Sequence, residues 1–159
     1  EPKAFNFGEQ LLKVPSLDGA GKMSKSENQF ATIYLSDNDK LITDKIKKAL
    51  TDSGPTQKNS PKPDYIQNIF LLMKLVSSNE VITKFETDYD NCSIRYGDMK
   101  KQLAEDMVNF ISPIRRRVDA IMNDDVYLRR VMEQGAEKAN KSANATMQLV
   151  RGAMGLNYY

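Results

Sequence analysis

Tyr96-Gly97-Asp98-Met99-Lys100-Lys101-Gln102-Leu103-Ala104-Glu105 begins the most regular apolar pattern of the chain. From this point an apolar side chain recurs every three or four positions, at Met99, Leu103, Met107, Phe110, Ile114, Val118 and Ile121. That period matches the turn of an α-helix and predicts a helix of about 25 residues with one core-facing side. Pro113 lies inside this helix and is expected to kink it.

Similar patterns on both sides predict a mostly α fold, a bundle of about five helices. The first helix should start at the cap-like run Ser36-Asp37-Asn38-Asp39 and stop at Gly54-Pro55. A second should begin at about Asp64, after a polar linker. A third should open with the capping pair Ser77 and Glu80.

The last predicted helix is long, with Asp124 and Asp125 at its start and Gly155 at its end. Its inner face is expected at Leu128, Met132, Ala136, Ala139, Ala143, Met147, Val150 and Met154. Residues 1–36 are different, because they are rich in turn residues. Leu11–Val14 and Phe30–Leu35 have the composition of short strands. We therefore interpret residues 1–36 as the tail end of an α/β domain and residues 37–159 as a helical domain.

The composition of the chain excludes several classes of functional site. The 159 residues suffice for one domain with a core, and the net charge of +2 permits an acidic partner such as RNA without requiring one. The chain has no histidine and one cysteine, Cys92, which excludes histidine-based catalysis, an internal disulfide and a cysteine-based metal site within it. The most apolar run, Ile69–Val76, falls far short of a membrane span. Without a disulfide framework, a cytoplasmic location is expected.

The candidate ligand-binding segment of the chain is Lys22-Met23-Ser24-Lys25-Ser26. Two ammonium groups and two hydroxyls within five residues form a set of donors suited to phosphate oxygens. Gly19 and Gly21 come just before and allow close approach of the backbone to a ligand. Met23 can anchor the loop while its neighbours face solvent or ligand. The expected cofactor-binding residues are Lys22, Met23, Ser24, Lys25 and Ser26.

This loop resembles, residue for residue, the second signature motif of the class I aminoacyl-tRNA synthetases, which binds the triphosphate of ATP in that family. Further segments resemble the C-terminal half of bacterial tryptophanyl-tRNA synthetases, namely Pro15–Gly19, Ala49–Ser53, Tyr96–Glu105, Pro113–Arg117, Gly135–Ala139 and Met154–Leu156. Tyrosyl-tRNA synthetases share the loop but usually continue into a further RNA-binding module. The other signature of the class contains histidine, so the resemblance implies that the first half of a Rossmann-type nucleotide-binding domain precedes this chain.

The resemblance implies a tryptophan–tRNA ligase that uses ATP with Mg²⁺, acts on tRNA and forms a homodimer. Lys25 and Lys22 would be its catalytic residues here, stabilising the charge that builds on the departing pyrophosphate. The helical region would be the anticodon-binding domain, with candidate tRNA contacts at Arg115, Arg116, Arg117, Arg129, Arg130, Lys138, Lys141 and Arg151. Three consecutive arginines cannot share one helix face, so at most two of Arg115–Arg117 point the same way. The chain alone is expected to be inactive.

Two alternatives stay open at the level of sequence. A non-catalytic helical RNA-binding module could keep the lysine-rich loop as a relic. A purely structural bundle would use its charged residues as a solvated surface, which is their usual role.

Overall fold

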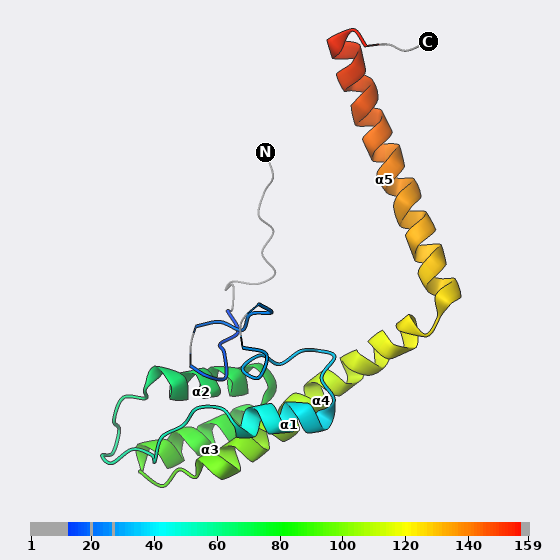
Figure 1. Ribbon diagram of the computed structural model, residues 1–159. Coiled ribbons are helices and arrows are strands. Elements are labelled where there is room, and N and C mark those ends of the chain that lie inside the picture. Colours follow the sequence, from blue (N-terminus) through cyan, green and yellow to red (C-terminus); the bar gives the residue numbers. More distant parts are fainter. Residues whose placement is uncertain (1–12, 20, 27, 157–159) are drawn as a thin grey trace. The chain divides into compact units, whose positions relative to one another are not determined.

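The computed structural model describes residues 13–19, 21–26 and 28–156, and this part of the chain contains five α-helices and no β-strand. The helices are α1 (Asp39–Lys47), α2 (Asp64–Val76), α3 (Asn79–Asp90), α4 (Tyr96–Met122) and α5 (Asp125–Met154) (Figure 1). The predicted mostly α bundle is therefore confirmed. None of these helices is both long and apolar enough to cross a membrane. Contacts divide the chain into two compact units that meet between Arg115 and Arg116, inside α4.

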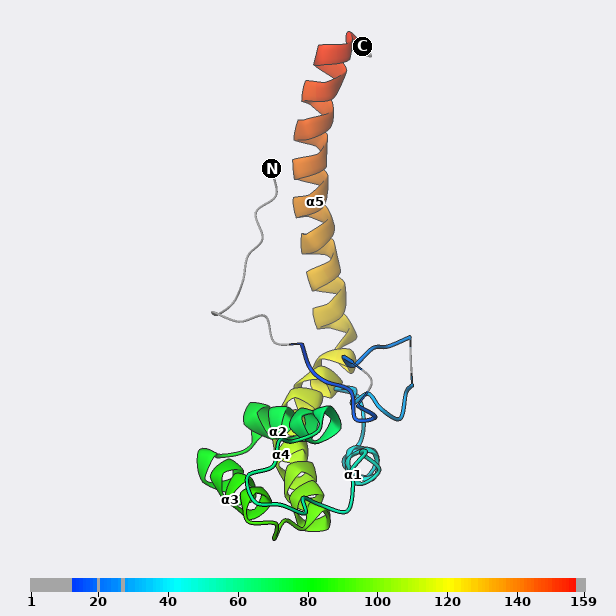
Figure 2. The same ribbon diagram turned by 90° about the vertical axis from the view of Figure 1, so that its left-hand side faces the viewer.

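The first unit is built on one apolar core. Helices α1, α2, α3 and the first part of α4 each turn an apolar side inward, and α1 is seen nearly end-on in Figure 2. Eight large side chains are almost completely buried: Ile42, Ile46, Ile66, Ile69, Leu72, Met73, Met99 and Leu103. Burying each stabilises the fold by about 1.5–3 kcal/mol relative to leaving it exposed. Leu17 and Ala31, from the irregular N-terminal segment, join the same core.

The predicted start of α1 is confirmed, whereas the cap of α3 is shifted by one residue from the prediction. Asn38 is the N-cap of α1 and accepts a hydrogen bond from the Leu41 amide at 2.8 Å. Ser78, not Ser77, caps α3. The Ser77 hydroxyl instead donates to Asp106 on α4 at 2.6 Å. Either serine of this pair could cap the helix. Because Ser77 donates to Asp106, Ser78 is the one that serves as the cap.

Helix α1 also ends at Lys47, well before the predicted stop at Gly54-Pro55. The ammonium of Lys100 on α4 donates to the carbonyl of Ala49 at 2.7 Å and to the Thr51 hydroxyl at 2.9 Å. Burial lowers the pKa of Lys100. A donor from another helix therefore satisfies carbonyls that further helical turns would otherwise have engaged.

The predicted strand Phe30–Leu35 is wrong. This segment consists of turns, bends and irregular backbone, because its backbone groups bond to a loop and to a side chain instead of to a neighbouring strand. The Ala31 carbonyl accepts from the Leu17 amide at 3.0 Å, and the Thr32 carbonyl accepts from Lys45 at 2.8 Å. Leu11 and Leu12 of the other predicted strand lie outside the described residues. Lys13 and Val14 are not in a strand.

The predicted apolar face of α4 is buried only in its first part, and that of α5 has no buried residue. In α4 the buried residues are Met99, Leu103, Ala104, Met107 and Ile111, whereas Phe110, Val118 and Ile121 are exposed. The helix continues through Pro113. In α5 the predicted caps are confirmed, because Asp124 accepts from the Tyr127 amide and Gly155 adopts a left-handed φ of 70°. No residue of α5 is buried, so nothing among the described residues covers its predicted inner face. The pattern of a helix shows where it could pack, and burial also requires another element to cover that face.

Candidate phosphate-binding loop

A tight turn leads into the lysine-rich loop. Pro15 and Lys22 form an isolated antiparallel bridge, and the Met23 amide donates to the Val14 carbonyl at 2.8 Å. Gly19 lies at the turn with a φ of +80°, and a Cβ added there would lie 2.9 Å from the Cβ of Tyr65 on α2. Only glycine combines this backbone conformation with such a close approach. The turn thereby places the loop next to α2.

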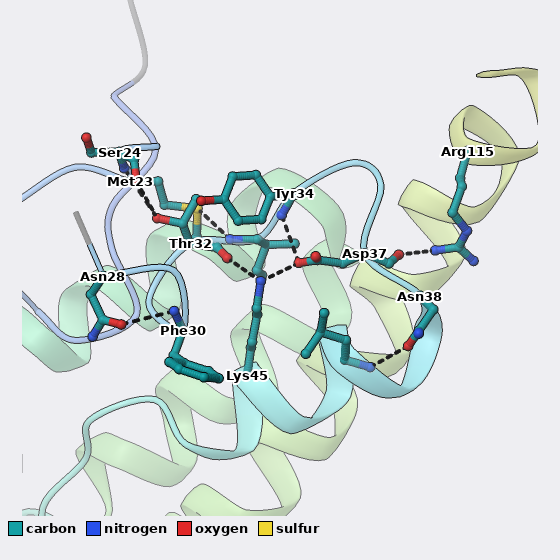
Figure 3. Close-up of polar contacts among 12 residues, drawn as sticks. Met23, Ser24, Asn28, Phe30, Thr32, Tyr34, Asp37, Asn38, Lys45 and Arg115 are labelled. Atoms are coloured by element: carbon teal, nitrogen blue, oxygen red, sulfur yellow. Dashed lines mark hydrogen bonds and ion pairs between the residues drawn. The ribbon is translucent and has the colours of Figure 1, made fainter. Parts of the chain in front are cut away.

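The middle of the loop is attached to the core. Met23 is half-buried and packs against the core, and its Sδ accepts from the Ile33 amide at 3.5 Å. The Thr32 hydroxyl donates to the Ser24 carbonyl at 3.0 Å, and the Ser24 amide donates to the same hydroxyl at 3.3 Å (Figure 3). The predicted anchoring role of Met23 agrees with this geometry. The contact between Thr32 and Ser24 was not predicted.

The charged side chains of the loop are exposed to solvent. Lys22 and Lys25 are both exposed, and neither makes a hydrogen bond or ion pair with another described residue. The hydroxyls of Ser24 and Ser26 lie 3.1 Å apart. The loop thus holds its backbone at Ser24 and presents two cations together with a mutually hydrogen-bonded pair of hydroxyls. An anionic group rich in oxygens, such as a phosphate chain, matches these donors.

A buried ion pair lies beneath the loop. Lys45 on α1 and Asp37 are only 5% and 7% exposed, and their charged atoms lie 2.6 Å apart. Asp37 also accepts from the Tyr34 amide at 2.9 Å, and the Lys45 ammonium lies 4.7 Å from the centre of the Tyr34 ring. Because the same ammonium donates to the Thr32 carbonyl at 2.8 Å, we call Thr32, Asp37 and Lys45 the loop base (Figure 3).

Sequence reasoning missed the loop base, although one signal was present. Lys45 lies between Ile42 and Ile46 on the apolar side of α1, at the spacing of core residues. A lysine at such a position requires a buried partner, because an unpaired buried charge is very unfavourable. The identity of that partner depended on a loop that no helical period describes.

The eight candidate tRNA contacts fall into two groups. Arg115 is engaged, since its guanidinium donates to the Asp37 carbonyl and to the Asp39 carboxylate. The remaining seven are exposed: Arg116, Arg117, Arg129, Arg130, Lys138, Lys141 and Arg151. Arg130 lies over the ring of Tyr127 at 5.5 Å. Within the described residues, no group of three or more acidic, histidine or cysteine side chains is placed to hold a metal ion.

Comparison with known proteins agrees with these features. The model of the class I tRNA synthetases for tryptophan and tyrosine (W and Y) matches residues 6–112. The tryptophan–tRNA ligase of Porphyromonas gingivalis is 50% identical over 98% of this chain and 47% of its own length. That of Bacillus subtilis is 36% identical over 98% of this chain and 46% of its own. The chain thus spans about half the length of these curated relatives.

Solved structures extend the similarity to the fold. A crystal structure of tryptophanyl-tRNA synthetase from Campylobacter jejuni, complexed with ADP and tryptophan, matches with a TM-score of 0.74 and 28% identity. The match covers 94% of this chain and 45% of that protein. The chain therefore belongs to the class I tRNA synthetases for tryptophan and tyrosine, and along nearly its whole length it resembles part of the tryptophanyl enzymes.

Proposed function

We propose that the full-length protein is a tryptophan–tRNA ligase, which activates tryptophan with ATP and transfers it to tRNA. This chain would supply the loop that holds the triphosphate and the helices that bind the anticodon. The observation that carries the proposal is the pair of exposed lysines, Lys22 and Lys25, on a backbone fixed at Ser24. The names of the curated relatives support tryptophan as the amino acid.

Activation joins the tryptophan carboxylate to the α-phosphate of ATP and releases pyrophosphate. Negative charge builds on the departing β- and γ-phosphates, and cations placed there beforehand stabilise that charge. Lys25 and Lys22 would provide them, while Ser24 and Ser26 would donate to phosphate oxygens. The residues Lys22–Ser26 include no carboxylate, so Mg²⁺ would arrive bound to the nucleotide rather than be held by this loop.

The Lys25→Ala substitution tests the proposal in the full-length enzyme. We expect the rate of tryptophan activation, followed by pyrophosphate exchange, to fall about 10²- to 10³-fold, or about 3 kcal/mol of transition-state stabilisation. Tryptophan affinity should hardly change, because in this proposal the loop would contact only the phosphates of ATP. Lys58→Ala, at an exposed lysine of the linker between α1 and α2, is the matched control. A Lys25→Ala rate within threefold of wild type would exclude Lys25 from this role and favour a non-catalytic RNA-binding module.

The same proposal assigns tRNA binding to the helical part. Neutralising a residue that contacts phosphate should weaken tRNA binding and reduce the slope of log affinity against log salt by about one unit. Filter binding with Arg129→Gln and Arg130→Gln measures this, with Lys58→Gln as control. Arg115→Gln is less informative, because Arg115 already binds Asp37 and Asp39. An unchanged slope for every exposed candidate would remove the helices from tRNA recognition. The homodimer stays a prediction from the resemblance, and the cytoplasmic location stays a prediction from the lack of a disulfide framework.

A further inference from the structure

We infer that Thr32 is a positioning residue for tryptophan activation, and that Lys45 holds Thr32 in place for this task. The inference rests on the proposed function, because it concerns how the lysines of the same loop are placed. It starts from the hydroxyl of Thr32, which binds the backbone of Ser24 at both the amide and the carbonyl. Ser24 lies between Lys22 and Lys25, so this contact controls the segment that carries both cations.

Thr32 is well suited to hold that segment. It is only 6% exposed, and its hydroxyl is engaged both as donor and as acceptor. Its own carbonyl accepts from the Lys45 ammonium, which is buried and paired with Asp37. A chain of short contacts thus runs from helix α1 to the loop backbone (Figure 3).

The loop base has a second function besides stability. A buried ion pair contributes little net stability, because removing two charges from water offsets most of their attraction. Here the pair supports one backbone carbonyl, and through Thr32 it fixes Ser24 relative to the core. Lys22 and Lys25 have no partner among the described residues that would fix them otherwise. Transition-state stabilisation by a cation depends on its position before the reaction, and a displacement of about 1 Å can cost about 100-fold in rate.

The test uses isosteric substitution in the full-length enzyme. Thr32→Val keeps the side-chain shape and removes both hydrogen bonds to Ser24, whereas Thr32→Ser keeps the hydroxyl. We expect Thr32→Val to lower kcat of pyrophosphate exchange about 10- to 100-fold. The KM for ATP and the affinity for tryptophan should stay within about threefold, and Thr32→Ser should restore kcat to within about threefold.

Thr87→Val is the matched control. Thr87 lies exposed on α3, and its hydroxyl donates to the Thr83 carbonyl at 2.8 Å, so the same chemical change occurs away from the loop. Its kcat should equal that of wild type. If Thr32→Val lowers the thermal midpoint but leaves kcat unchanged, Thr32 is merely structural and the inference is overturned. Should Thr32→Val fail to fold, Thr32→Ala is read by the same criteria.

A double-mutant cycle with Lys25→Ala separates the two proposals. If Thr32 acts by placing Lys25, Thr32→Val should change kcat less than about threefold in the Lys25→Ala background. Effects that multiply would overturn the positioning role. A rate lost in Lys25→Ala but kept in Thr32→Val contradicts this inference alone. A rate kept in Lys25→Ala contradicts the proposed function, and the inference with it.

Discussion

The segment of residues 13–37 and helix α5 differ in opposite ways. The described residues of this segment form no helix or strand, yet they include the buried polar residues Ser16, Thr32 and Asp37. Helix α5 is regular over 30 residues and capped at both ends, yet none of its residues is buried. Regular local structure and attachment to a core are therefore separate properties. In this protein the position of the proposed catalytic loop depends on attachment to the core.

The sharpest way to break this comparison is to remove the lysine of α1 that binds the segment, Lys45, and in parallel a lysine of α5. Lys45→Met leaves Asp37 as an unpaired buried charge and should lower the free energy of unfolding of the first unit by about 3–5 kcal/mol. Lys141→Met, on exposed α5, should leave it unchanged. Urea unfolding of the full-length protein, with hydrogen exchange resolved by segment, measures both. Equal losses of unfolding free energy in the two variants would show that α5 is attached as firmly as the loop base.

Alanine in place of glycine should act with opposite sign in the two regions. Gly19→Ala forces a left-handed φ and a contact of 2.9 Å with the Tyr65 Cβ, and should destabilise the first unit by about 2 kcal/mol. Gly135→Ala in α5 meets no atom within 4 Å and should stabilise that helix by about 1 kcal/mol. Thermal unfolding and helix-amide exchange report the two changes. A destabilising Gly135→Ala would indicate that another surface covers this face of α5.

The smallest expected effect concerns the N-caps of α1, which follows the segment and packs in the first unit, and of α5. Asn38 and Asp124 each accept from a backbone amide at 2.8 Å. Asn38→Ala should lower the free energy of unfolding of the first unit by about 1 kcal/mol, because α1 unfolds together with its core. Asp124→Ala should speed amide exchange only in the first turn of α5. If Asp124→Ala also lowered the stability of the first unit, the two regions would be one cooperative body.

Much of the helical part could be predicted from sequence because helices are local. The 3.6-residue period, the caps at Asp124 and Gly155 and the start of α2 at Asp64 depend on residues within a few positions of one another. The errors have a common cause. Phe30–Leu35 has the composition of a strand, but without a partner strand its carbonyls bond to Leu17 and Lys45. The apolar period of α5 likewise does not determine which face of this helix another element covers.

The features of the candidate site likewise fall into those that the local sequence determines and those that depend on contacts between distant segments. The donors can be identified from the amino-acid sequence alone, because Lys22, Ser24, Lys25 and Ser26 lie close together in the chain and their chemistry needs no fold to be recognised. Only the tertiary structure decided how they are held, since Thr32 and Lys45 lie 8 and 21 positions beyond Ser24 and meet it through a buried hydroxyl and a buried ion pair. The physical reason is that donor chemistry belongs to single residues, whereas position arises from contacts between segments that only folding brings together.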